Sequence, residues 1–302
     1  MTVENQTPLV SIIINNYNYG HFVHEAIESA LSQTYQHTEI IVVDDGSTDN
    51  SLDVIASYKD RVVPVLKDNG GQASAFNAGF AASRGEIICL LDSDDLFLSE
   101  KVTEIVKIFA EYPDIGWCFH RLRFINAKTG DFVRLSRESG TRACDFRAQI
   151  QKNGKLAFYG PATSGLCFKR SLLQKILPMP EMIRITSDNY LKTAALGLDK
   201  GYFLDNQLAI LRLHGNNHYT DRPNNQPLEA KIAILTAYCL RNELPSLTKH
   251  ANKLFSHGMG VAWKTGGITP ETSQTAQNYL STVSPWERLE INMRAIYHCI
   301  KP

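Results

Sequence analysis

The first third of the chain alternates between short apolar runs and segments with helical spacing. The runs are rich in β-branched side chains and apolar at successive positions, and a polar loop follows each of them. Strands are expected at Leu9–Ile14, Glu39–Val43, Val62–Leu66 and Ile87–Leu91, with a helix over Gln72–Ser83. Strands that are apolar on both faces indicate a mostly parallel sheet flanked by helices on both sides.

The pattern changes twice further along the chain. Shorter apolar runs and longer polar loops follow Ile115, and helical spacing dominates beyond Pro227. With 302 residues and 43% hydrophobic side chains, the chain suits an α/β domain with a helical C-terminal extension. The expected boundaries are 1–114 and 115–222 for two halves of the α/β domain, and 223–302 for the extension.

Composition excludes several classes of protein. The 31 basic and 31 acidic side chains balance, so no global field favours binding to nucleic acid. The six cysteines lack metal-binding spacing, and we expect them to be reduced thiols. The polar N-terminus does not resemble a signal peptide, and no apolar run could cross a bilayer. We expect a cytoplasmic protein that could contact the inner face of a membrane only peripherally.

The most informative motif is Asp92-Ser93-Asp94-Asp95, directly after the apolar run Ile87–Leu91. Carboxylates this close repel one another unless a cation or hydrogen-bond donors compensate. Mg²⁺ and Mn²⁺ prefer oxygen ligands and often share their coordination shell with substrate phosphates. The motif therefore predicts a site for a divalent ion and a diphosphate, with a solvated acidic turn as the structural alternative.

A second acidic motif, Asp44-Asp45-Gly46-Ser47, follows the run Glu39–Val43. A carboxylate at a strand end can accept a hydrogen bond from a nucleobase, although an Asx turn would give the same pattern. The chain has no glycine-rich phosphate-binding loop of the P-loop or G-x-G-x-x-G type. Phosphate binding is therefore expected to depend on the metal ion.

Five motifs together carry a family resemblance. They are Val10–Asn18, Ser29–Thr34, Val42–Asp49, the pair Asn77-Ala78-Gly79 and Arg84-Gly85-Glu86, and Leu91–Asp95. In order and spacing this set resembles the family-2 nucleotide-sugar glycosyltransferases, which have the GT-A fold. The resemblance covers roughly the first third of the chain and becomes scattered after about residue 115. It implies a donor-binding half at 1–114 and an acceptor-binding half at 115–222.

The resemblance also implies roles for individual residues. Asn15 and Tyr17 would contact the nucleoside, and Asp45 would contact the base. Asp92 and Asp94 would form the D-x-D pair that holds the metal. Asp94 would be the more direct metal ligand, and Asp92 would also lie near the ribose. Further positions are implied in the second half: the catalytic base Asp188, the diphosphate and metal residues Arg212 and His214, and the acceptor-side residues Thr163 and Ser164. For Asp188 the structural alternative is a helix N-cap.

The function implied is inverting, metal-dependent transfer from a nucleotide-diphosphate sugar, most simply a UDP-sugar, to a saccharide, lipid-linked or protein acceptor. Such chemistry belongs to the synthesis of polysaccharides or other glycoconjugates. Two alternatives stay open at this point: a sugar nucleotidyltransferase, and a non-catalytic nucleotide-binding module of the same fold. Incubation with a panel of nucleotide sugars and Mn²⁺, followed by assays for released nucleoside diphosphate and released pyrophosphate, separates these alternatives from a glycosyltransferase.

The last predicted helix carries an apolar stripe of five side chains: Trp286, Leu289, Met293, Ile296 and Ile300. We expect this stripe to dock, either on the catalytic domain, on a second copy of the chain or on a membrane surface.

Overall fold

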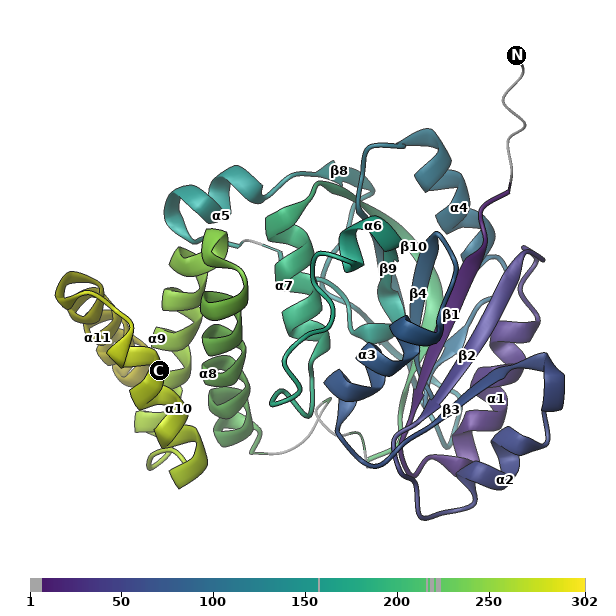
Figure 1. Cartoon of the computed structure of the whole chain (residues 1–302), viewed down its shortest axis with the longest axis horizontal. Helices are drawn as coiled ribbons and strands as arrows, with labels where there is room; N and C mark the ends of the chain where they lie inside the picture. The colour runs from purple at the N-terminus through teal and green to yellow at the C-terminus, as the bar shows by residue number, and fades with distance from the viewer. Residues whose placement is uncertain (1–6, 157, 216, 218–219, 221–223, 302) are drawn as a thin grey trace. The chain divides into compact units, whose positions relative to one another are not determined.

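The structure, a computed structural model, describes residues 7–156, 158–215, 217, 220 and 224–301 (Figure 1). The chain forms two compact units. Unit 1 comprises Met1–Asp145, Phe158–Glu181 and Asp199–His214, and unit 2 comprises Phe146–Ala157, Met182–Leu198 and Gly215–Pro302. The segments 146–157 and 182–198 thus belong to the unit of the C-terminal helices, although the sequence analysis assigns them to the acceptor half. The three-part division stays a prediction.

Unit 1 is built on one mixed sheet with the strand order β3-β2-β1-β4-β9-β6-β10-β5. Four neighbouring strands at one end of it are parallel, and β9 runs antiparallel between β4 and β6. The strands in this order are β3 (Val63–Leu66), β2 (Thr38–Asp44), β1 (Val10–Asn16), β4 (Ile87–Asp92), β9 (Leu166–Lys169), β6 (Trp117–Asn126), β10 (Gly201–Leu213) and β5 (Leu96–Phe97). Two short strands, β7 (Phe132–Leu135) and β8 (Arg142–Cys144), pair with β6 and β10. This is the predicted α/β fold of the GT-A type.

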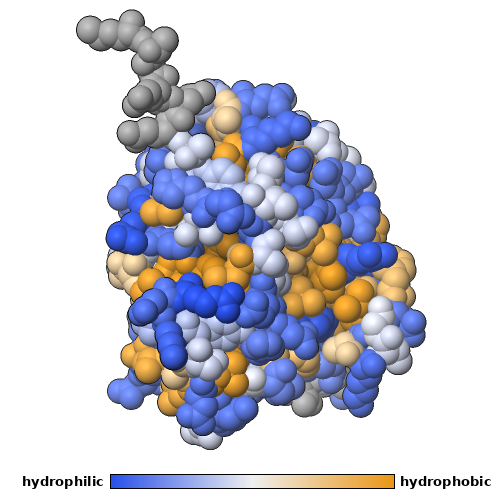
Figure 2. Space-filling model, turned by 90° about the vertical axis from the view of Figure 1, so that its right-hand side faces the viewer, coloured by the Kyte–Doolittle hydropathy of each residue, from blue (hydrophilic) through white to orange (hydrophobic). Residues whose placement is uncertain are grey.

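Helices pack on the parallel strands because these strands are apolar on both sides. Ile12 and Ile14 of β1 belong to the core that also contains Val23 of α1 (Gly20–Leu31). Ile13 points the other way, towards α3 (Gln72–Ala82), where a Cβ on Gly79 would lie 2.5 Å from its Cγ2 atom. The remaining helices of unit 1 are α2 (Ser51–Ala56), α4 (Lys101–Glu111) and α6 (Arg170–Leu173), with short turns η1 (Lys59–Arg61) and η2 (Thr163–Gly165). The surface is mixed in character: on the face drawn in Figure 2, apolar side chains lie in groups among hydrophilic ones.

Unit 2 is helical, as expected for the C-terminal extension. Its elements are α5 (Arg147–Asn153), α7 (Asp188–Leu198), α8 (Gln226–Glu243), η3 (Pro245–Leu247), α9 (Thr248–Lys264), α10 (Pro270–Ser281) and α11 (Pro285–Ile300). The rings of Phe255 in α9 and Tyr279 in α10 stack 4.0 Å apart, both buried. Among the described residues, no helix is long and apolar enough to span a bilayer.

Helix α11 is attached to unit 2 through one side only. Ile291 and Ala295 are buried, and Arg241 of α8 pairs with Glu287 at 3.1 Å. Ser284 and Glu287 form a capping box that starts the helix. The predicted apolar stripe lies outside this contact: its side chains are between 50% and 76% exposed. The stripe is therefore not part of the core of unit 2.

The Glu287 contacts predict how stability depends on pH. Partial burial raises the pKa of the Glu287 carboxyl, but hydrogen bonds, the largest of them from Arg241, outweigh it and lower that pKa to about 2. A lowered pKa stabilises the fold above the unfolded value of about 4.3, and this contribution disappears as the pH falls towards 2. The Glu287 contribution to the free energy of unfolding should be about 1 kcal/mol or less, the range for a largely solvated ion pair, and should be lost between pH 5 and 2 in urea unfolding of the wild type. Glu287→Gln should lose less over the same interval; an equal loss would contradict this assignment.

Candidate functional site

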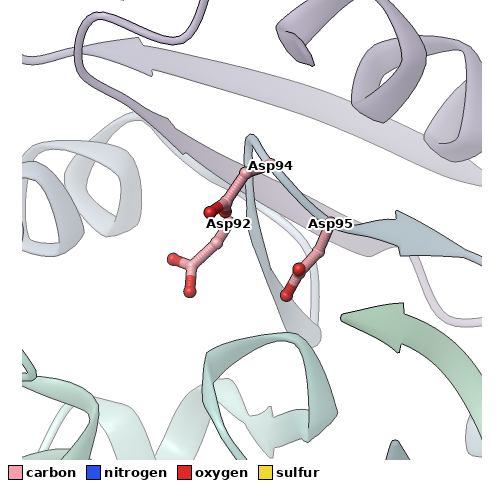
Figure 3. Close-up of side chains that lie close together, drawn as sticks. All are labelled: Asp92, Asp94 and Asp95. Carbon is pink, nitrogen blue, oxygen red and sulfur yellow. The ribbon is translucent and has the colours of Figure 1, made fainter. Parts of the chain in front are cut away.

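The candidate site lies in unit 1, where β4 ends in a tight turn. Asp92 is the last residue of β4 and is paired with Asn15 of β1. The Asp95 amide donates to the Asp92 carbonyl at 3.0 Å, which closes the turn. Ligand atoms of Asp92, Asp94 and Asp95 lie within 4.8 Å of one another, and the three side chains leave the turn on the same side (Figure 3). The predicted acidic cluster therefore exists as a geometric group.

The three carboxylates differ in their surroundings. Asp95 is 2% exposed and accepts hydrogen bonds from Ser164 Oγ at 2.6 Å and from the Arg212 amide at 3.2 Å. Burial, and then the charges of Asp94 and Asp92, raise the pKa of the Asp95 carboxyl well above its ordinary value. Asp92 and Asp94 are only partly buried. The outer two carboxylates are thus placed to meet a ligand, whereas Asp95 links the turn to the protein.

Ser164 connects this turn to the predicted acceptor-side segment. Its hydroxyl donates to Asp95 and accepts from the Asp92 amide at 3.2 Å. Lys101, completely buried at the start of α4, donates from Nζ to the Ser164 carbonyl at 2.9 Å. Thr163 Oγ1 and Asp92 Oδ1 each lie 3.4 Å from Gln72 Nε2. The structure therefore brings Thr163 and Ser164 to the acidic turn.

The predicted pair Arg212 and His214 also meets this turn. His214 Nε2 lies 3.0 Å from Asp94 Oδ2. Arg212 donates from Nε to the Asp94 carbonyl and forms an ion pair with Glu25 of α1. Its guanidinium lies 4.5 Å from the ring centroid of Phe22. Arg212 and His214, at the end of β10, therefore both contact Asp94.

Tyr19 belongs to this group, although the sequence analysis does not identify it. Its ring lies 5.4 Å from that of His214 in an edge-on arrangement. Burial, followed by the charges of Asp94, Asp92 and Asp95, raises the pKa of Tyr19. The position of Tyr19 in the loop after β1 could have indicated a site residue, but a tyrosine in a loop belongs to no pattern that distinguishes it. Gln72 in α3 and Lys101 in α4 were missed because their contacts with Thr163 and Ser164 join residues far apart in the sequence.

The predicted nucleoside residues lie at the ends of the neighbouring parallel strands. Asn15 is 9% exposed, and neither its Oδ1 nor its Nδ2 has a hydrogen-bond partner among the described residues. Tyr17, 38% exposed, follows β1. A buried amide without partners costs free energy unless a ligand or water supplies them. Asn15 is thus a position where a bound molecule would complete the hydrogen bonding.

Asp45 is held by the segment that precedes α3. Its carboxylate accepts from Lys67 Nζ at 2.8 Å, from Asn69 Nδ2 at 3.1 Å, and from the amides of Gly70 and Gly71 at 2.9 and 2.7 Å. These contacts fix the loop between β3 and α3 against the end of β2. Contact of Asp45 with a base stays a prediction.

Asp188, the predicted catalytic base, lies in unit 2 as the first residue of α7. It is 7% exposed, and its carboxylate lies 3.1 Å from Lys192 Nζ one turn along the helix. A helix therefore starts at Asp188, which is its first residue. Its role stays a prediction.

Comparison with known proteins decides the family. The sequence model described as "Glycosyl transferase family 2" matches residues 11–177, more than half of the chain. The chain belongs to glycosyl transferase family 2. An uncharacterized glycosyltransferase of Nostoc sp. (strain PCC 7120 / SAG 25.82 / UTEX 2576) is 38% identical over 228 residues, which cover 74% of this chain and 70% of that protein. The protein is therefore a glycosyltransferase, which decides against the nucleotidyltransferase alternative.

Two further comparisons concern a relative whose name specifies its reaction and a solved structure. The Escherichia coli UDP-Glc:alpha-D-GlcNAc-diphosphoundecaprenol beta-1,3-glucosyltransferase is 41% identical over 114 residues, 35% of this chain and 45% of that protein. The crystal structure of S. aureus TarS 1-349 in complex with UDP-GlcNAc has a TM-score of 0.66 at 16% identity, covering 96% of this chain and 89% of that one. The likeness to this structure supports the predicted GT-A fold. The UDP-GlcNAc that TarS binds is a nucleotide sugar, the kind of donor that the predicted class of enzyme uses.

The Ser164 contacts of this glycosyltransferase can be tested through stability. Ser164→Ala removes one donor from the buried Asp95 and the acceptor of the Asp92 amide, and should lower the free energy of unfolding by about 1–3 kcal/mol. Ser93→Ala is the matched control: its hydroxyl is buried in the same turn without a hydrogen-bond partner among the described residues. Its removal should cost about 0.5 kcal/mol or less. Equal losses in urea unfolding would show that Ser164 does not support the turn.

Proposed function

We propose that this glycosyltransferase is inverting and metal-dependent, and that it moves a sugar from a UDP-sugar to a hydroxyl of a saccharide acceptor carried on a lipid. The acidic turn carries the proposal: Asp92, Asp94 and Asp95 converge within 4.8 Å, with His214 3.0 Å from Asp94. The E. coli relative, whose name specifies UDP-Glc and a diphosphoundecaprenol acceptor, supports the choice of donor and acceptor.

The residues present fit a hard divalent ion. Partly exposed carboxylates offer oxygen ligands, and their mutual repulsion favours a bound cation. Asp94 and Asp92 would hold Mn²⁺ or Mg²⁺, with His214 beside them. When bound, the ion neutralises the charge that develops on the departing nucleoside diphosphate. A mannosyltransferase of Pyrobaculum calidifontis, with a TM-score of 0.50 to this chain, was solved with GDP-Man and Mn²⁺.

The strand ends would hold the rest of the donor. The side-chain amide of Asn15, which has no hydrogen-bond partner in the described part of the chain, would contact the nucleoside. Tyr17 would lie against the nucleoside, and Asp45 would contact the base. Arg212 would offset phosphate charge, since its guanidinium already lies beside the acidic turn. Thr163 and Ser164 would border the acceptor, because they adjoin Asp92 through Gln72 and the Asp92 amide.

Asp188 would act as the general base. It would take the proton of the acceptor hydroxyl as that oxygen attacks the anomeric carbon, opposite the bond to the leaving diphosphate. One in-line displacement inverts the anomeric centre. Lys192, 3.1 Å from Asp188, would keep the carboxylate oriented.

The metal role predicts a specific loss of binding. Asp94→Ala should weaken binding of UDP in the presence of Mn²⁺ about tenfold or more, because Asp94 is one of the residues that would hold the ion. In EDTA, wild type and variant should bind UDP alike. Isothermal titration calorimetry measures both, with the exposed Asp131→Ala as a control for lost surface charge. Equal Mn²⁺-dependent affinity of Asp94→Ala and wild type would remove the metal from the proposal.

The base role predicts a loss of rate without a loss of donor affinity. Asp188→Asn keeps the shape and can still cap α7, but it cannot accept a proton. Transfer should fall about a hundredfold or more, the usual contribution of a general base, with donor affinity nearly unchanged. Measuring transfer under saturating donor and donor affinity by calorimetry separates the two effects. If Asp188→Asn keeps most of its transfer rate while Asp188→Ala is merely less stable, Asp188 is a cap and not the base.

A further inference from the structure

Helix α11 has two apolar sides, and unit 2 uses only one of them. Ile291 and Ala295 are buried, while six large apolar side chains of the same helix are exposed: Trp286 (76%), Leu289 (50%), Met293 (63%), Ile296 (53%), Tyr297 (55%) and Ile300 (74%). At 100° per residue these six fall within roughly 100° of the helix circumference, opposite Ile291 and Ala295. We call these six residues the α11 outer face. Such a continuous exposed stripe marks a docking surface.

The charges around the α11 outer face indicate which kind of partner it binds. Residues 248–302 contain six basic and three acidic side chains, whereas the whole chain is neutral. Both acidic residues of α11 are already paired within the protein: Glu287 with Arg241 at 3.1 Å and Glu290 with Arg294 at 2.7 Å. Arg288 and Lys301 on this segment are exposed. Residues 285–301 contain three basic and two acidic side chains, so α11 and the residue after it carry a small excess of positive charge.

Helix α9 extends the same surface. Lys264 donates from Nζ to the Lys301 carbonyl at 2.9 Å, which places the end of α9 beside the end of α11. Lys264 is exposed, and the preceding Trp263 is 43% exposed. Tryptophan and tyrosine combine an apolar ring with a polar group, which suits the boundary between lipid chains and headgroups. The surface thus combines aliphatic, aromatic and basic side chains.

We propose that the α11 outer face, with Trp263 and Lys264, binds the surface of a bilayer that contains anionic lipids. An apolar stripe of a surface helix inserts at the boundary of headgroups and acyl chains, and basic residues add attraction to anionic headgroups. A second copy of the chain fits less well, because a two-fold contact along α11 would bring together two helices that both carry net positive charge. The proposal adds a membrane partner to the proposed function and does not depend on the transfer chemistry.

Vesicle flotation with the full chain tests the proposal. The wild type should float with vesicles of phosphatidylglycerol and phosphatidylcholine, bind less to phosphatidylcholine alone, and be released by high salt. Met293→Gln with Ile296→Gln should lower the partition coefficient about tenfold or more, because two inserted side chains are lost. Arg288→Gln with Lys301→Gln should remove most of the preference for phosphatidylglycerol.

The matched control changes two exposed apolar residues elsewhere. Phe132→Ser with Val133→Ser alters β7 in unit 1, where both are about half exposed, 54% and 47%. This variant should bind vesicles like the wild type. Hydrolysis of a soluble nucleotide sugar reports the proposed chemistry separately and should be the same in every variant. Failure of the wild type to bind either vesicle overturns the proposal, as does a dimer in sedimentation that Met293→Gln with Ile296→Gln dissociates.

Discussion

Repulsion among three carboxylates is the constraint around which unit 1 is arranged. Asp92, Asp94 and Asp95 lie within 4.8 Å, which is unfavourable unless donors or a cation offset their charge. The protein supplies donors to the innermost of them: Ser164 and the Arg212 amide bind Asp95, and the buried Lys101 holds the Ser164 carbonyl. The outer two carboxylates are only partly buried, and Gln72 and His214 contact them. The same contacts tie β4, η2 and β10 to one turn.

The parallel strands account for why this turn lies beside the predicted nucleoside residues. Asn15 pairs with Asp92, and Asn16 pairs with Asp44, so the carboxyl ends of β1, β2 and β4 are level. Ligands of α/β proteins bind at such ends. Unit 2 contributes a different feature: its last helix presents one apolar face to the unit and another to solvent. We propose functions for two surfaces: the strand ends of unit 1 and the exposed side of α11.

Local patterns made the first third of the fold predictable. The apolar run Leu9–Ile14 corresponds to β1, Gln72–Ser83 to α3, and Asp92 ends β4 as expected. Contacts between distant residues were not predictable. Ser164 and Asp95 are 69 positions apart, and neither local sequence indicates that they form a hydrogen bond. Tyr19 and Lys101 act through similar long-range packing. The loop that holds Asp45 was missed because its donors include the backbone amides of Gly70 and Gly71, which any residue could provide.

In the proposed function, Asp92 and Asp94 would hold a divalent ion beside the diphosphate of the donor. Crystals grown with UDP and Mn²⁺, measured at the manganese absorption edge, locate the ion directly by its anomalous scattering. We expect an anomalous peak within coordinating distance of the Asp94 carboxylate and of the UDP diphosphate. UDP bound at the ends of β1 and β4 with no such peak, or with the peak away from Asp94, would contradict it.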